Sequence, residues 1–224
     1  MKTLPNDTAT SLSSWDKSFP KELSYEEKYQ NTLKEWKKFT QGESKIDHSI
    51  IPNDVLESWN RCRKIGMDSA FRKIDKVLSE DELHKLLRRN EEFIEASRPF
   101  MKNLYQFFMG SGFLVALFDV RGFVLEIIGD DDIVQHVAEG NFVLGASLRE
   151  EHAGTNAVGS VVELKKPIQI FGCQHYRKNY HKETCSSSPI FDPEEIHRRN
   201  QSVRTILQSK PPHSGNGRGG FAGH

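Results

Sequence analysis

The sequence predicts an α+β fold, in which a helical N-terminal region precedes a mostly antiparallel sheet flanked by helices. Two observations predict this class. Apolar residues recur at helical spacing up to about residue 110, and the pattern then changes to short runs rich in β-branched and aromatic residues. With 224 residues, the chain is long enough for one domain with added helices or for two small domains.

Three helical stretches are expected in the N-terminal region. Residues 24–40 suit a charged amphipathic helix with one apolar stripe. Residues 54–66 are expected to form a second helix that stops at its final glycine. Residues 79–82 (SEDE) have capping-box spacing and begin a longer helix, which Pro99 either kinks or divides into two segments.

The second half of the chain is expected to form a sheet. Residues 113–119 and 123–129 are β-rich runs joined by a short turn, which is the pattern of a hairpin. Residues 130–139 suit a short helix with acidic residues in its first turn. Residues 167–172 and 187–193 indicate two further strands.

The composition gives no sign of a nucleic-acid or membrane partner. Lys and Arg together number 31, as do Asp and Glu, so the formal net charge is zero. No stretch is long and apolar enough to span a bilayer, and the first residues lack the apolar core of a secretory signal. With three cysteines and no such signal, we expect a cytoplasmic protein with reduced thiols.

One group of residues resembles a metal site. Cys173, His175, His181 and Cys185 lie within a span that could close around zinc, which takes cysteine and histidine ligands. The spacing C-x-H-x5-H-x3-C lacks the C-x-x-C pairing of strong zinc motifs. A loop whose histidines and cysteines face a pocket or pack in the interior is therefore the favoured interpretation, and no metal or other cofactor is predicted.

The segment GTNAVG, residues 154–159, has two interpretations that are compatible with each other. Its glycines could expose backbone N–H groups to an anionic ligand. Alternatively, Thr155 or Asn156 caps a helix that follows. Glu150 and Glu151, just before it, could accept hydrogen bonds from a ligand or form a solvated acidic turn. The segment lacks the lysine of a phosphate-binding loop. No catalytic triad, carboxylate pair or HExxH motif is present, so the protein is not predicted to be an enzyme.

Five motifs then occur in a fixed order along residues 50–193. They are SWNRC from residue 58, LVALFDVRG from residue 114, EEHAGTNAVG from residue 150, CQHY from residue 173 and CSSSPIFDP from residue 185. Together they resemble the N-terminal sensory region of acetoin-catabolism-type activators of sigma-54-dependent transcription. In that family the region contains a GAF domain.

The resemblance implies a cytosolic small-molecule sensor that controls a following AAA+ ATPase and a helix-turn-helix domain. It implies an effector resembling acetoin, bound among residues that match the family motifs. These residues are Glu150, Glu151, Thr155, Asn156, His175, Tyr176 and Cys185. The sequence has no Walker motif and no helix-turn-helix, so neither ATP hydrolysis nor direct DNA binding is expected of this fragment.

Two other functions stay open beside the sensor. Helices at residues 24–40 and 79–110 could make a homodimer or a protein-interaction module. The second alternative is a metal-binding protein that uses Cys173, His175, His181 and Cys185.

These expectations divide the chain into four segments. Residues 1–22 are a disordered leader, residues 23–95 a helical region, residues 96–193 an incomplete GAF-like sensory domain and residues 194–224 a disordered tail. In the family, SPIFDP is followed by a strand like IGVLDLSG and a helix opening PHTLGMVAAA. Neither occurs here, so the last strand and helix are expected to be missing, which would leave a sheet edge uncovered.

The genetic code offers an explanation for the tail. If its codons are read one base later, residues 197–205 can spell I-G-V-I-(N/S)-L-S-G and residues 211–224 can spell P-H-T-L-G-M-V-A-A-A-(S/L)-x-A. Each shifted codon allows only a few residues, so agreement over such a run is not expected by chance. We therefore hypothesise a frameshift after about residue 193. The alternatives are a flexible Arg/Gly-rich tail and a basic RNA-binding arm.

The hypothesis is tested by the DNA sequence around codon 194. A one-base shift there should open a reading frame for the strand, then the helix, and then an ATPase domain, whether the error lies in the gene or in its sequencing. A shifted frame that contains none of these would refute it.

Overall fold

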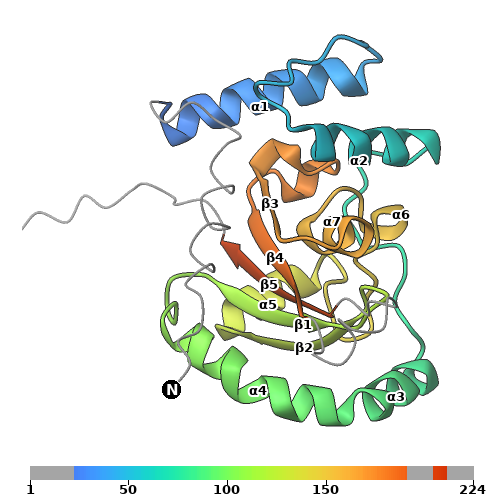
Figure 1. The fold of residues 1–224 in the computed structure, drawn as a ribbon, viewed down its shortest axis with the longest axis vertical. Coiled ribbons are helices and arrows are strands. Elements are labelled where there is room, and N and C mark those ends of the chain that lie inside the picture. The colour runs from blue at the N-terminus through green and yellow to red at the C-terminus, as the bar shows by residue number, and fades with distance from the viewer. Residues whose placement is uncertain (1–22, 191–203, 211–224) are drawn as a thin grey trace, which may run out of the picture.

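A five-stranded antiparallel sheet lies at the centre of the structure (Figure 1). The structure is a computed structural model that describes residues 23–190 and 204–210. Within these residues the strand order is β2-β1-β5-β4-β3. The strands are β1 (Leu114–Phe118), β2 (Val124–Gly129), β3 (Ile168–Phe171), β4 (Thr184–Ile190) and β5 (Arg204–Lys210). The predicted α+β class is confirmed.

Helices lie on both sides of this sheet. They are α1 (Tyr25–Thr40), α2 (Asn53–Lys64), α3 (Glu80–Arg89), α4 (Glu91–Gln106), α5 (Asp131–Ala138), α6 (Glu150–Ala153) and α7 (Ala157–Leu164), with 3-10 turns η2 (Gly172–Gln174) and η3 (Lys178–Tyr180). In the described part of the chain, none of the helices has the length and apolar character needed to cross a membrane.

Local sequence signals place most of these elements. Ser79 forms the predicted capping-box contacts at the start of α3, and Ser24 forms the same contacts at the start of α1. The long helix predicted from residue 79 is two helices, and they meet at Asn90 rather than at Pro99, which lies inside α4. Asn90 leaves helical geometry, and its Nδ2 donates to the Leu86 carbonyl oxygen at 2.8 Å. This bond satisfies a carbonyl group at the end of α3, where the chain changes direction.

Strand β1 is buried on both faces and separates two apolar cores. Val115 and Leu117 face the core covered by α3 and α4. Leu114, Ala116 and Phe118 alternate with them and face the core shared with α7 and the N-terminal helices. All five are almost completely buried. In Figure 1, α3 and α4 accordingly lie below the sheet, and α1 and α2 lie above it.

Two tryptophans join α1 and α2 to the segment of residues 172–181, called here the 172–181 loop. Nε1 of Trp36 donates to the Tyr176 carbonyl oxygen at 2.9 Å, and Nε1 of Trp59 donates to the Gln174 carbonyl oxygen at 2.7 Å. Trp59 is completely buried. The N-terminal helices are therefore part of the same core as the sheet and hold the loop in place.

The prediction that the last strand is missing and that residues 194–224 are disordered is wrong for residues 204–210. These residues form β5, which pairs antiparallel with both β1 and β4. Without β5, β1 and β4 would each present an open row of backbone donors and acceptors to solvent. The sequence RTILQSK contains β-branched and apolar residues that suit a strand, and it closes this gap. The remainder of the tail and the predicted leader lie outside the described residues.

A proline in the centre of β5 tests this assignment. Ile206 pairs with Leu117 on one side and with Ser188 on the other, so Ile206→Pro removes an amide donor from a central strand. We expect a loss of roughly 3 kcal/mol in the free energy of unfolding, measured by urea denaturation. Asn216→Pro, which lies after β5, is the control. Equal stability of the two variants would mean that residues 204–210 do not form a strand.

Candidate functional site

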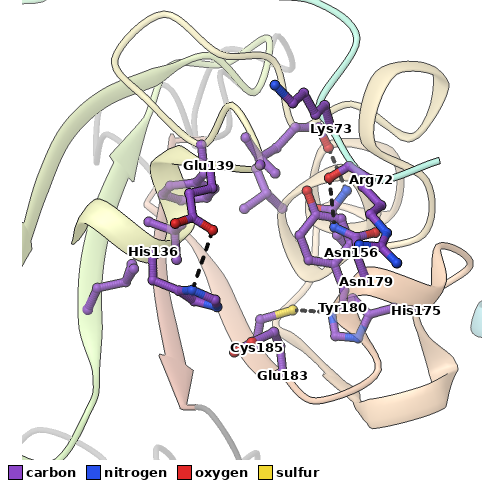
Figure 2. Close-up of a pocket in the computed structure, with 16 residues that line it drawn as sticks. Arg72, Lys73, His136, Glu139, Asn156, His175, Asn179, Tyr180, Glu183 and Cys185 are labelled. Atoms are coloured by element: carbon purple, nitrogen blue, oxygen red, sulfur yellow. Dashed lines mark hydrogen bonds and ion pairs between the residues drawn. The ribbon is translucent and has the colours of Figure 1, made fainter. Parts of the chain in front are cut away.

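A cavity of about 350 Å³ lies beside the sheet (Figure 2). Its apolar wall includes Leu114 from β1, Phe142 and Val158. Polar residues surround this wall, and Figure 2 shows two groups of them. His136 and Glu139 lie on one side, and the other side is formed by the 172–181 loop together with Arg72 and Lys73.

Three of the seven predicted ligand-binding residues meet at this cavity: Asn156, His175 and Cys185. His175 Nδ1 lies 2.9 Å from the Gly172 carbonyl oxygen, which can only accept, so Nδ1 carries the proton. Nε2, 3.0 Å from Cys185 Sγ, then accepts a hydrogen bond from the thiol. The histidine and the cysteine thus satisfy each other as neutral groups.

Burial keeps this pair uncharged. It lowers the pKa of His175 to about 4 and raises the pKa of Cys185 to about 12. A nucleophilic cysteine needs a lowered pKa, usually beside a positively charged histidine. The pair is therefore a polar part of the cavity wall and lacks the character of a catalytic dyad.

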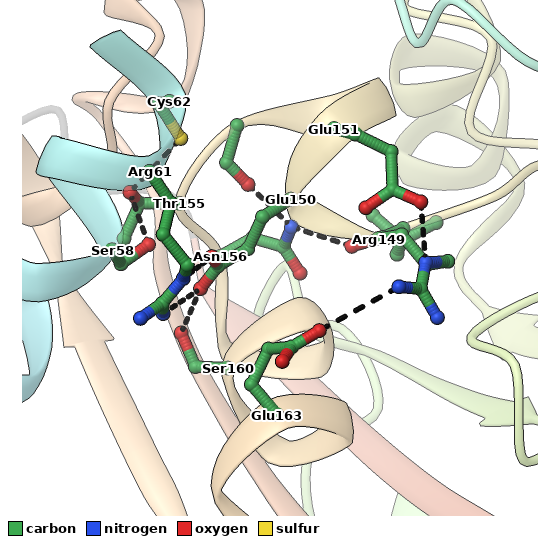
Figure 3. A network of polar contacts seen from close by, with 12 residues as sticks. Ser58, Arg61, Cys62, Arg149, Glu150, Glu151, Thr155, Asn156, Ser160 and Glu163 are labelled. Carbon is green, nitrogen blue, oxygen red and sulfur yellow. Dashed lines mark hydrogen bonds and ion pairs between the residues drawn. The ribbon is translucent and has the colours of Figure 1, made fainter. Parts of the chain in front are cut away.

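Glu150 lies away from the cavity, in an ion pair between α6 and α2 (Figure 3). Its carboxylate accepts from Arg61 through both oxygens, at 2.6 and 2.9 Å, and from Ser160 Oγ at 3.4 Å. The side chain is almost fully buried, and its two oxygens are occupied. Glu150 therefore fastens α2 to α6 and α7.

The two polar residues of GTNAVG also bind protein atoms. Thr155 Oγ1 lies 2.6 Å from Ser58 Oγ, again joining this segment to α2 (Figure 3). Asn156 caps α7, since its Oδ1 accepts from the Gly159 N–H at 2.9 Å, and its Nδ2 donates to the carbonyl oxygens of Leu148 and Gly154. The predicted helix cap is confirmed and belongs to Asn156.

The glycines of the same motif are required by close packing. A Cβ atom at Gly159 would lie 2.8 Å from the Leu148 carbonyl oxygen, which is too close for any side chain. Gly154 has a φ of +76°, a conformation that other residues rarely adopt. The motif thus shapes the turn into α7.

The remaining two predicted residues point elsewhere. Glu151 forms an ion pair with Arg149 at 2.6 Å on the surface (Figure 3). Tyr176 is buried against Phe39, and its hydroxyl donates to the Met67 carbonyl oxygen at 3.4 Å. Neither lines the cavity.

The four residues of the possible zinc site do not converge. Cys173 lies beside Tyr29, and the His181 ring packs edge-on against Trp36 with ring centroids 4.5 Å apart. Of the four side chains, those of His175 and Cys185 contact each other, whereas His181 Nε2 lies 3.2 Å from the backbone carbonyl oxygen of His175. Across residues 23–190, no group of three or more histidine, cysteine or acidic side chains is arranged to hold a metal ion.

The sequence did not indicate several of the residues that line the cavity. Chief among them are Asn179 and Tyr180 of the 172–181 loop, and Arg72 and Lys73. The latter two belong to residues 67–78, called here the strap, which links α2 to α3. Asn179 Nδ2 donates to the Arg72 carbonyl oxygen at 3.2 Å. Residues in turns have no hydrophobic periodicity, so only the histidine and cysteine spacing drew attention to this region.

Comparison with known proteins assigns the chain to a family. The family model of the MimR N-terminal domain matches residues 36–207. A signal-transduction and transcriptional-control protein of Clostridium beijerinckii is 36% identical over 141 residues, which are 62% of this chain and 22% of that protein. The acetoin dehydrogenase operon transcriptional activator AcoR of Bacillus subtilis (strain 168) is 28% identical over 185 residues, or 83% of this chain and 29% of AcoR.

A solved structure shares the fold. The crystal structure of the E. coli DhaR(N)–DhaL complex contains a chain that matches with a TM-score of 0.65 and 17% identity, covering 70% of this chain and 52% of that one. The chain spans less than a third of the length of the two sequence relatives, at 22% and 29%.

The buried histidines predict how stability depends on pH. Burial lowers the pKa of both His175 and His181 to about 4, whereas in the unfolded chain both titrate near 6.5. Their contribution should be complete above pH 6.5 and be lost as the pH falls toward 4, because the unfolded state then binds more protons. The expected slope is about 1.4 kcal/mol per pH unit for each histidine.

Urea unfolding between pH 7 and pH 4 measures this slope. His181→Gln should remove roughly half of the histidine contribution. His136→Gln, at an exposed position in α5, is the control for the exchange of a histidine for glutamine. A slope that is the same in all three proteins would contradict the assignment of neutral buried histidines.

Proposed function

The chain belongs to the MimR N-terminal domain family, and on that premise we propose that it is a regulatory sensing domain whose ligand occupies the cavity beside the sheet. The observation that carries this proposal is the cavity itself. It has a volume of about 350 Å³ and an apolar wall with a few polar groups, which is the usual character of a site for a small molecule.

The relatives suggest the class of effector. AcoR is an activator of an acetoin dehydrogenase operon, so we propose a small, uncharged metabolite of the acetoin type. The cavity supports this size and polarity, since two buried polar residues of its wall, His175 and Cys185, are neutral. A charged ligand would have to be desolvated against an apolar wall, and the cationic lining residues Arg72 and Lys73 are themselves exposed to solvent.

The finer assignments follow from the resemblance of the motifs. We propose that the five-stranded sheet and its helices form a GAF domain and that the domain acts in the cytoplasm. In a sigma-54-dependent activator, its output would be control of an ATPase domain. Ligand binding would shift an equilibrium between two conformations of the domain. The size of the shift is set by the difference in the ligand's affinity for the two conformations.

A second candidate function rests on exposed apolar residues at the end of α4. Phe100, Phe107 and Met109 are 72%, 84% and 63% exposed. Apolar side chains gathered in this way are typical of interaction surfaces. They support the alternative of a dimerisation or protein-interaction module.

Thermal unfolding with acetoin tests the sensor. At a concentration about 100 times Kd, binding should raise the free energy of unfolding by about 2.7 kcal/mol, which corresponds to roughly 5–10 °C. Val137→Phe narrows the cavity from α5 and should abolish the shift. Val134→Phe, at a half-buried position of the same helix outside the cavity wall, should retain it.

Two outcomes would contradict the sensor. One is an equal acetoin-induced rise in melting temperature in Val137→Phe and wild type, which would mean that acetoin binds outside the cavity. The other is the absence of any shift together with concentration-dependent self-association in sedimentation experiments, which would favour the interaction module.

A further inference from the structure

Two polar atoms in the cavity wall, whose side chains lie near each other, make no hydrogen bond of normal geometry to the described residues. They are the hydroxyl of Tyr180 and Oδ1 of Asn179. Both atoms are buried, and they belong to consecutive residues of the 172–181 loop (Figure 2). Buried polar groups are almost always paired in native proteins, so two neighbouring exceptions in one cavity call for an explanation.

The orientation of Asn179 is fixed by its other end. Nδ2 lies 3.2 Å from the Arg72 carbonyl oxygen, and a carbonyl oxygen can only accept a hydrogen bond. The amide nitrogen must therefore point to the strap, which leaves Oδ1 as an acceptor. Tyr180 is held beside it by the bond from its N–H to the Arg177 carbonyl oxygen at 3.2 Å and by its packing against the His175 ring.

The other buried polar groups of the wall are already used. Asn156 binds three backbone groups, and His175 and Cys185 bind each other. A ligand that used those atoms would have to break protein hydrogen bonds. At Tyr180 and Asn179 it would gain hydrogen bonds without breaking any.

We propose that Tyr180 and Asn179 are the specificity-determining pair of the cavity, which rests on the proposed sensing function. Tyr180 donates to an oxygen of the ligand, and Asn179 Oδ1 accepts from a hydroxyl group of the ligand. The pair therefore selects an uncharged compound that carries an acceptor oxygen and a hydroxyl on neighbouring atoms. A carboxylate is disfavoured, because its oxygens can only accept and would meet Oδ1 of Asn179.

The same pair connects the ligand to the strap. The Asn179 amide bridges the cavity and the Arg72 carbonyl group, and Arg177, in the same loop, pairs with Asp75 of the strap at 2.6 Å. Arg177 also donates to the Lys73 carbonyl oxygen. A ligand bound at Tyr180 and Asn179 thus contacts the part of the loop that fastens the connection between α2 and α3.

Calorimetric titration of the full chain with acetoin tests this assignment. Tyr180→Phe should weaken acetoin binding about tenfold, the effect of one lost hydrogen bond. Tyr176→Phe is the matched control and should stay within about twofold of wild type, since its hydroxyl lies outside the cavity wall. Butane-2,3-dione, which has no hydroxyl for Asn179, should bind the wild type about tenfold more weakly than acetoin.

Thermal unfolding without ligand supplies a second measurement. A structural role for the Tyr180 hydroxyl would change the melting temperature of Tyr180→Phe in the opposite direction to a ligand-binding role. Removing an unpaired buried hydroxyl should leave the melting temperature of Tyr180→Phe equal to or above that of the wild type. A lower melting temperature would show that the hydroxyl has a structural partner, and it would overturn the proposal even if no probe bound.

The binding outcomes separate the two proposals. Wild-type protein that binds acetoin, with Tyr180→Phe unaffected, overturns the role of the pair and leaves the sensing function intact. Wild-type protein that binds neither acetoin nor butane-2,3-dione contradicts both the acetoin-type effector and the ligand class assigned to the pair.

Discussion

The two indole N–H groups that hold the 172–181 loop are the interactions on which the rest of the site depends. Trp36 and Trp59 reach across from α1 and α2 and satisfy buried carbonyl groups of the loop. A buried loop carries backbone groups that cannot reach water, so it is stable only where such partners exist. The N-terminal helices supply them. The backbone of the loop at Gln174 and Tyr176 is thereby tied to the core beneath it.

The EEHAGTNAVG motif mainly connects elements of the fold to one another. Glu150 and Thr155 connect α6 and the start of α7 to α2 (Figure 3), and Gly159 allows the backbone at Leu148 to approach closely. Of its polar residues, only Asn156 reaches the cavity, and that side chain is fully engaged with backbone. The motif therefore acts mainly in building the fold, and a ligand in the cavity would contact it at Asn156 and Val158.

Signals confined to neighbouring residues predicted most elements correctly. The capping box at Ser79, the hairpin and the glycine after α2 depend on adjacent residues, and each is where the sequence places it. The pairing of β5 depends on contacts between distant segments, so the sequence did not reveal it. The break at Asn90 rests on a local bond to Leu86, but an asparagine inside a helical pattern is a weaker signal than the proline that follows it. The same distinction decides which residues of the candidate site the sequence could indicate. Histidine and cysteine spacing indicated His175 and Cys185, whereas Asn179 and Tyr180 matter through burial without a partner, which only the folded chain can show.

We propose that a small ligand binds in the cavity walled by the 172–181 loop and that its binding also affects the strap, residues 67–78. Amide hydrogen exchange of the full chain, with and without acetoin, measures this directly. We expect slower exchange in residues 172–181 and 67–78 when acetoin is present, and unchanged exchange in α3. Protection confined to the exposed end of α4, or no protection in either segment, would contradict it.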